Sequence, residues 1–167
     1  MAYYISTLAG AQPIANTETT QKHQLGTIVR AWDPTYGEGE FIYLLGVGST
    51  VVGSVVKYNA TSYLTELITV SNGKNKGVPV AVAMSANVAN QYGWYQIGGN
   101  AVVKKTTVAV TPQVPIFISG TSGRIKVLAS AGQQILGAQT ANLTTIVTTT
   151  STVVVTINRP ATQGQIT

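Results

Sequence analysis

The residues that could carry out catalysis are few and lie near the N-terminus. A Ser-His-Asp relay needs a histidine base, and His23 is the only histidine in the chain. Such a base must be held rigidly, whereas His23 lies in a polar segment without apolar periodicity. We therefore interpret His23 as an exposed loop residue. The chain contains no cysteine, which excludes disulfides, thiol catalysis and cysteine-bound zinc but leaves the redox compartment open.

Three carboxylates, Asp33, Glu38 and Glu40, lie close together in the sequence. Two of them could serve a glycosidase as acid and base, or all three could bind calcium. Catalytic carboxylates usually come from separate elements that face each other across a cleft, and the Asp-x-Asp-x-Asp-Gly calcium pattern is absent. Because the stretch 33–39 has turn residues at both ends, we predict a polar contact loop, with no metal, no cofactor and no enzymatic role.

The stretch 46–53 is rich in glycine, as phosphate-binding loops are. A phosphate-binding loop continues into a Lys-Ser/Thr pair or into a helix N-terminus that supplies N–H donors. Neither feature follows here, so we expect these glycines to bend a strand or to form a bulge.

Five aromatic residues could stack on sugars or nucleic-acid bases: Trp32, Tyr36, Tyr92, Trp94 and Tyr95. The alternative is that they fill the core. Trp94 and Tyr95 are neighbours on one predicted strand and point to opposite faces, so at most one of them is expected in the core. Trp32 and Tyr36 flank a loop and are the better candidates for an exposed contact.

Segments of strand-forming residues separated by glycine turns must position these side chains. Strands are predicted at residues 26–32, 40–45, 50–58, 63–70, 78–84, 94–97, 101–105, 106–110, 114–118, 124–129, 131–138 and 142–158, with Arg159-Pro160 ending the last. Residues 71–77 are predicted as a hairpin tip, and no helix is predicted. This spacing predicts an all-β fold, a compact β-barrel or β-sandwich of antiparallel strands in which residues 27–167 form a single domain.

The strongest strand signal is a three-stranded meander over residues 78–105. Bulky side chains at positions 78, 80, 82 and 84 alternate with Ala81 and Ala83, so both faces of the first strand are apolar. A strand of this kind lies inside a barrel or sandwich. A polar connector follows at 85–92, a strand resumes at Trp94, Gly98-Gly99-Asn100 turns it, and residues 101–105 return.

Residues 1–26 are predicted as an extended N-terminal arm that becomes ordered on a partner. They are polar and lack periodicity, and their only bulky cluster is Tyr3, Tyr4 and Ile5. Aromatic anchors of this kind favour contact with another protein. A frayed tail or a first edge strand would have a similar composition.

Charge is scarce and unevenly distributed. Only 9% of the residues are charged, against roughly 25% in an ordinary soluble domain, so we expect much of the surface to be covered by copies of the chain or by a larger assembly. All five acids lie in the first 66 residues, and the remainder holds seven basic residues and no acid. This asymmetry favours docking on a charged surface or head-to-tail contact between copies. The alternative, nucleic acid, would require a dense basic run, and the basic residues are scattered.

Neither a membrane nor a secretion pathway is predicted. No apolar run approaches the roughly 18 residues that a membrane span requires. The N-terminal stretch has no basic residue before its apolar part, which is untypical of a signal peptide.

Residues 26–31 (GTIVRA), 36–47 (YGEGEFIYLLGV), 79–88 (PVAVAMSANV) and 93–99 (GWYQIGG) together resemble the small head-decoration, or capsid cement, proteins of tailed bacteriophages. The resemblance extends over residues 26–105 and fades in the threonine-rich C-terminal third. Its motifs are not catalytic, so they bear on fold and role.

The resemblance implies a β-rich protein without enzymatic activity that forms a small symmetric oligomer, a dimer or trimer. It would be made in the host cytoplasm, and in the virion it would clamp neighbouring subunits of the major capsid protein on the outer surface of the head. The contacts are expected at the margins of the core, in the arm, the acidic loop 33–40 and the basic tip 71–77. The expected contacts with the capsid or another copy are Tyr3, Tyr4, Ile5, Trp32, Asp33, Tyr36, Glu38, Lys74 and Lys76.

Two other functions stay open. A carbohydrate-binding module of a fibre or adhesin would use Trp32, Tyr36 or Trp94 as a stacking platform. A nucleic-acid-binding barrel would use the basic residues that follow residue 66 and would lose affinity steeply with salt.

Overall fold

The computed structural model of the chain describes residues 4–5 and 12–165. Almost all regular structure in these residues is β-strand, as predicted. In chain order the elements are β1 (Tyr4–Ile5), β2 (Thr17–Glu18), β3 (Ile28–Asp33), β4 (Gly37–Leu45), β5 (Val55–Tyr58), β6 (Thr65–Leu67), α1 (Val70–Gly73), β7 (Val80–Ala83), β8 (Tyr92–Lys104), β9 (Pro115–Ile118), β10 (Ile125–Lys126), β11 (Gln134–Thr140) and β12 (Thr152–Thr162).

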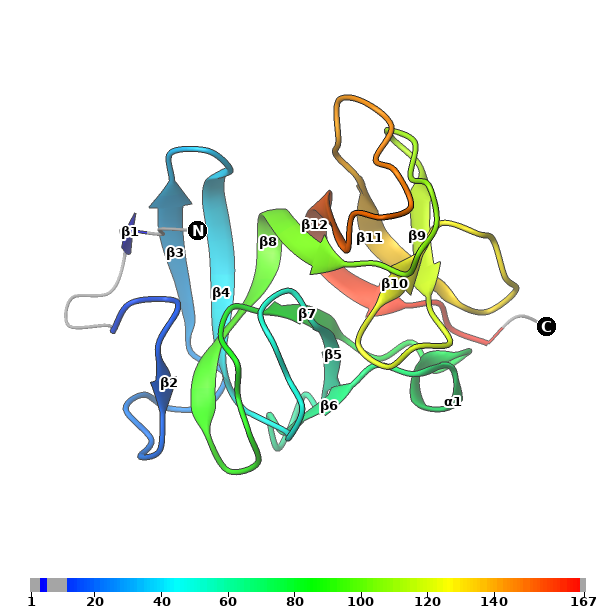
Figure 1. Ribbon diagram of the computed structural model, residues 1–167. Coiled ribbons are helices and arrows are strands. Elements are labelled where there is room, and N and C mark those ends of the chain that lie inside the picture. The colour runs from blue at the N-terminus through cyan, green and yellow to red at the C-terminus, as the bar shows by residue number, and fades with distance from the viewer. Residues whose placement is uncertain (1–3, 6–11, 166–167) are drawn as a thin grey trace.

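All strand pairings are antiparallel, and the strands form one curled sheet. Its main path runs β1-β3-β4-β8-β12-β11-β9-β10, and β5, β6 and β7 branch from β8. Two isolated parallel bridges bring distant parts of the sheet together: Leu45 pairs with Leu64 beside β6, and Lys105 pairs with Ile125 of β10. Figure 1 shows β3 and β4 at one end of the molecule, β9 to β11 at the other, and β8 between them.

Strand β8 is shared by the two halves of the sheet. Strand β4 pairs with one edge of β8 over residues 92–98, while β2, β7 and β12 follow each other along the opposite edge. The meander predicted for 78–105 is therefore wrong in its second half, because β8 continues through Gly98-Gly99-Asn100 without a turn. Gly99 has φ 89° and lies next to a register shift in the β4 pairing, so the glycines make a bulge instead.

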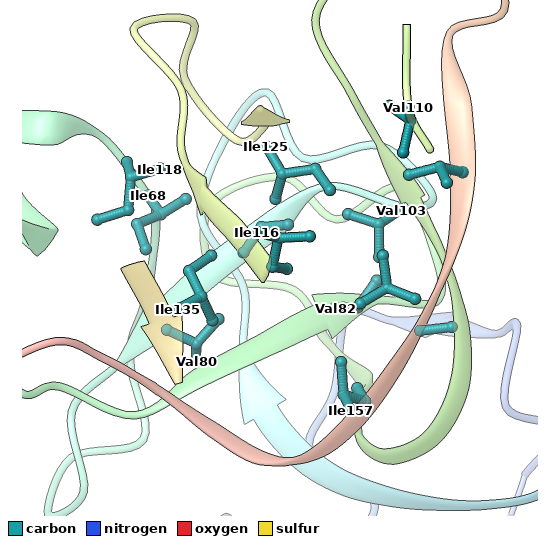
Figure 2. Close-up of a cluster of buried hydrophobic side chains, with 14 residues drawn as sticks. Ile68, Val80, Val82, Val103, Val110, Ile116, Ile118, Ile125, Ile135 and Ile157 are labelled. Carbon is teal, nitrogen blue, oxygen red and sulfur yellow. The ribbon is translucent and has the colours of Figure 1, made fainter. Parts of the chain in front are cut away.

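The prediction for the first strand of that segment is confirmed, since every residue of β7 is buried. Val80 and Val82 belong to the larger core, which lies between β7 and the half of the sheet around β9 to β12 (Figure 2). Ala81 and Ala83 face a second core that includes Tyr95. The bulky face of the strand thus packs in one core and its small face packs in another.

A third core contradicts the prediction that only one of Trp94 and Tyr95 is buried. Both are fully buried, because Trp94 packs with Phe41 and Tyr43 on the face of β8 that is opposite Tyr95. What covers this face is the N-terminal segment itself, with Ile14 only 2% exposed. The expectation of an arm that orders only on a partner is wrong for residues 12–26.

Three smaller predictions also need correction. Residues 70–73 form the helical turn α1, not part of a hairpin tip, because Thr69 and Asn72 make a capping box at its start. Strand β12 passes through Arg159-Pro160 to Thr162, and Arg159 takes a left-handed φ of 43° that lets the chain continue. Residues 50–54 form a turn that precedes β5 and are not part of a strand.

The bulge in β8 yields a test of the shared-strand architecture. A Cβ at Gly99 would overlap the backbone oxygen of Glu38, and the left-handed φ adds strain for any other residue. We expect Gly99→Ala to lower the free energy of unfolding by about 2 kcal/mol or more in urea denaturation. Gly120→Ala is the matched control, since a Cβ there meets nothing within 4 Å. Equal stability of the two variants would contradict the assigned role of the bulge.

The N-terminal cover yields a second test. Because Ile14 fills the core around Trp94, we expect Ile14→Ala to destabilise the protein by about 2–4 kcal/mol. Thermal unfolding followed by the near-UV circular dichroism of the buried aromatic residues measures the effect. Val88→Ala, at a 52% exposed position, should leave the midpoint unchanged. An unchanged midpoint for Ile14→Ala would mean that residues 12–26 do not contribute to the fold.

Candidate functional site

The predicted contact residues divide into two groups that lie far apart. Residues Trp32, Asp33, Tyr36 and Glu38 gather at the β3–β4 hairpin, where Tyr4 of β1 pairs with Trp32. For Tyr4 and Ile5 the structure describes the strand and not the side chains, and Tyr3 lies outside the described residues.

The second group, Lys74 and Lys76, lies just after α1 at the other end of the molecule (Figure 1). Both lysines are exposed, and they line an open hollow of about 580 Å³ with Ser71 and Gln165. The structure therefore does not bring the predicted acidic loop and the predicted basic residues of one chain together.

Within the hairpin, Asp33 has a structural role. It is only 3% exposed, and its Oδ1 accepts hydrogen bonds from the backbone N–H groups of Thr35 at 2.8 Å and Tyr36 at 3.0 Å. This is how an aspartate shapes a turn. Asp33 thus determines the path of the loop and has almost no surface of its own to offer a partner.

The remaining hairpin residues belong to a polar surface that crosses the sheet. The exposed positions of β3 alternate with buried ones, so Arg30 and Trp32 share the outer face. Arg30 is opposite Glu40, Glu40 is opposite Gly98, and Gly98 is opposite Asn158. A neighbouring row begins with Trp32 opposite Glu38.

That second row ends in the other half of the sheet. Asn100 is opposite Thr156, which is opposite Gln139 of β11. The hydroxyl of Thr156 donates to Asn100 Oδ1 at 2.7 Å, and Asn100 Nδ2 donates to the carbonyl of Tyr36 at 3.3 Å. We call the two rows together with Arg159, which binds Glu40, the polar face; its members are Arg30, Trp32, Glu38, Glu40, Gly98, Asn100, Gln139, Thr156, Asn158 and Arg159.

The polar face is hollowed on both sides of β12. One hollow of about 380 Å³ lies between Arg30, Glu40 and Arg159, and a second of about 380 Å³ lies beside Gln134 and Gln139. Residues 156–158 line both. Gly98 keeps the first hollow open, because its position in the row carries no side chain and a Cβ there would contact Glu40 at 3.2 Å.

The charges of the polar face are paired within the chain. Glu40 Oε1 accepts from Arg30 Nη2 at 3.1 Å and Nε at 3.3 Å, and Glu40 Oε2 accepts from Arg159 Nη2 at 3.4 Å. Glu38 lies 3.8 Å from Arg30 Nη1. Because two arginines and two glutamates meet here, the cluster has no net charge. The sequence pointed to Glu38 and Trp32 but not to Arg30, Arg159 or Asn158, whose proximity depends on strand register.

The sequence predicts that His23 is an exposed loop residue, and this prediction is wrong. The side chain is half-buried among aromatic rings. Its ring centroid lies 5.3 Å from that of Tyr43 and 5.5 Å from that of Trp94, and its Nε2 forms a 2.5 Å hydrogen bond with Gln12 Oε1. Burial raises the pKa of the neighbouring Tyr43 phenol. These contacts hold the N-terminal segment on the sheet. Within the described residues no three histidine, aspartate or glutamate side chains gather as a metal site.

A second buried charge is Lys105, which is 1% exposed and which no sequence pattern singled out. Its Nζ donates to three backbone carbonyls, those of Val108 at 2.8 Å, Val147 at 3.1 Å and Thr106 at 3.3 Å. An ammonium group has three N–H donors, so all are used. Burial lowers the pKa of Lys105, and the three acceptors counter this by favouring the charged form. No local pattern distinguishes this lysine from Lys104.

Comparison with protein-family models finds no match to this chain, and comparison with curated proteins finds no significantly similar sequence. The resemblance to capsid cement proteins therefore stays a prediction. The described residues contain no helix that is long and apolar enough to cross a membrane.

Lys105 provides the test for this part of the structure. Lys105→Met keeps the length of the side chain but leaves three carbonyls without their donor, so we expect a loss of stability on the order of 2 kcal/mol in urea denaturation. Lys104→Met removes the same charge from a half-exposed position one residue earlier and should be nearly neutral. A similar midpoint for both variants would show that the three hydrogen bonds do not stabilise the fold.

Proposed function

We propose that this chain is a structural virion protein that binds the outer surface of a bacteriophage head and cements adjacent subunits of the major capsid protein. Its partners would be the capsid protein and, in a dimer or trimer, other copies of itself. It would act without a cofactor and without catalysis, and it would be made in the host cytoplasm.

The observation that carries this proposal is the exposed apolar surface in the loops. Leu143 is 96% exposed and Val147 is 58% exposed, both in the loop between β11 and β12. Neighbouring exposed apolar side chains are typical of surfaces that another protein covers, and Leu143 and Val147 lie four residues apart in one loop. The low content of charged residues, 9%, agrees with a chain that works inside an assembly.

These apolar side chains stand on a rigid support. The loops 106–113 and 141–151, which we call the apolar loop pair, are joined by the bridge between Val110 and Ile146. The Asn142 side chain donates to the Val110 carbonyl at 3.1 Å, and Lys105 Nζ binds a carbonyl in each loop. Pre-ordered loops lose little entropy on binding, which favours a clamp that must hold at many sites.

The contact residues predicted from the sequence fit this proposal unevenly. Lys74 and Lys76 are exposed and can contact a capsid or another copy, whereas the predicted contacts of Tyr3, Tyr4 and Ile5 stay predictions. Asp33 does not fit, since it is buried in its turn. A protein that binds the assembled shell and not free subunits stabilises the shell by mass action.

The test is co-sedimentation with expanded heads that lack the protein, from the phage whose genome encodes it. We expect wild-type protein to sediment with heads and to raise their disruption temperature. Leu143→Ser combined with Val147→Ser should weaken attachment at least tenfold, because both exposed apolar anchors are lost.

Val88→Ser, at an exposed position of the 85–91 loop, is the matched control and should attach normally. Unfolding midpoints of all proteins establish that the variants are folded, and light scattering after size exclusion measures the oligomer. Failure of the wild-type protein to bind heads would overturn the proposed function. Full attachment of the double variant would overturn the assignment of the apolar loop pair.

A further inference from the structure

The polar face includes Trp32 and Glu38, which the sequence predicted as capsid or oligomer contacts, but no residue of the apolar loop pair, and its construction points to a ligand. It spans strands β3, β4, β8, β12 and β11, and it joins two hollows of about 380 Å³ each. Volumes of this size are within the range of small-molecule sites, about 300–1,000 Å³. Both hollows are open, and because residues 156–158 line both, a ligand that extends across β12 can reach the two.

The side chains around the hollows are planar polar groups. The guanidinium groups of Arg30 and Arg159 hold the Glu40 carboxylate by both of its oxygens. The side-chain amides of Asn158 and Gln139 are exposed on the same face. Sugar hydroxyls both donate and accept hydrogen bonds, so carboxylate, amide and guanidinium groups together match them. Because Glu40 is already held in place, ordering it on binding requires little further entropy.

An aromatic platform lies at one end of the polar face. Trp32 is 51% exposed, shares the outer face of β3 with Arg30, and is paired with Glu38 across the hairpin. A half-exposed indole presents an apolar ring face, on which the C–H groups of a pyranose can stack. Trp94, which the sequence also offered as a platform, is fully buried and cannot serve.

The electrostatics select the class of ligand. Two arginines and two glutamates neutralise each other in the cluster, so the polar face lacks the excess positive charge that would attract a polyanion. It also lacks the apolar centre typical of a protein interface. We propose that the polar face binds a neutral oligosaccharide of pyranose units, with one sugar stacked on Trp32 and the following units lying across Gly98 toward Gln139.

The experiment uses the full chain and neutral probes, namely malto-, cello-, xylo-, laminari- and mannohexaose, with titration calorimetry and saturation-transfer NMR as readouts. We expect at least one hexaose to bind, with saturation transfer to its ring protons. Trp32→Ala should lower the association constant about tenfold or more, because it removes the stacking platform. Asn158→Trp, at an exposed position, should abolish binding by filling the space between the hollows.

Val88→Ser and the Leu143→Ser, Val147→Ser double variant are the controls and should bind the hexaose like wild type. Unfolding midpoints verify the fold, and Asn158→Ala replaces either test variant that is unstable. The proposal is overturned if no hexaose binds, or if binding survives both Trp32→Ala and Asn158→Trp. Glycan binding needs no capsid, so its outcome is separate from that of head attachment.

Discussion

The architecture depends on one long strand that is shared by the two halves of the sheet. Strand β8 pairs with β4 on one edge and with β2, β7 and β12 in turn on the other. The change from β7 to β12 takes place at Gly98-Gly99, where the left-handed backbone of Gly99 lets the Glu38 carbonyl approach closely. Without a glycine there, the two halves of the sheet could not share a strand in this register.

Sharing β8 has consequences for burial. A strand in the middle of a curled sheet has both faces covered, which is why the neighbours Trp94 and Tyr95 are both fully buried, in different cores. The same arrangement brings the end of β8 under two loops, so Lys105 is desolvated and its ammonium is bound by carbonyls instead of water. A buried cation without an acid is tolerable only when its donors are satisfied in this way.

Features that depend on the local sequence pattern could be predicted from the sequence. Features that depend on the register between strands could not. Alternation in β7 predicted its two apolar faces, and turn chemistry predicted the loop at Asp33. The interruption at Gly98-Gly99 was interpreted as a turn, because a bulge and a turn use the same residues. Arg30 and Glu40 meet across the β3–β4 hairpin, but Arg159 of β12 is 119 residues from Glu40 in the sequence, and no spacing rule reveals that contact. The cover of residues 12–26 was missed because Ile14 and Leu25 are widely spaced in an otherwise polar segment.

The scarcity of charge acquires a physical meaning in this fold. Glu38, Glu40 and Glu66 are all paired with arginine or lysine side chains of the same chain, so most of the few acids act within the chain. The surface has two regions of different chemistry. One is the neutral polar face over β12, and the other is the apolar loop pair, which Lys105 binds. A surface that served one partner would not need two such regions on a single rigid sheet. The division therefore agrees with the two separate contacts proposed above, one through the apolar loop pair and one through the polar face.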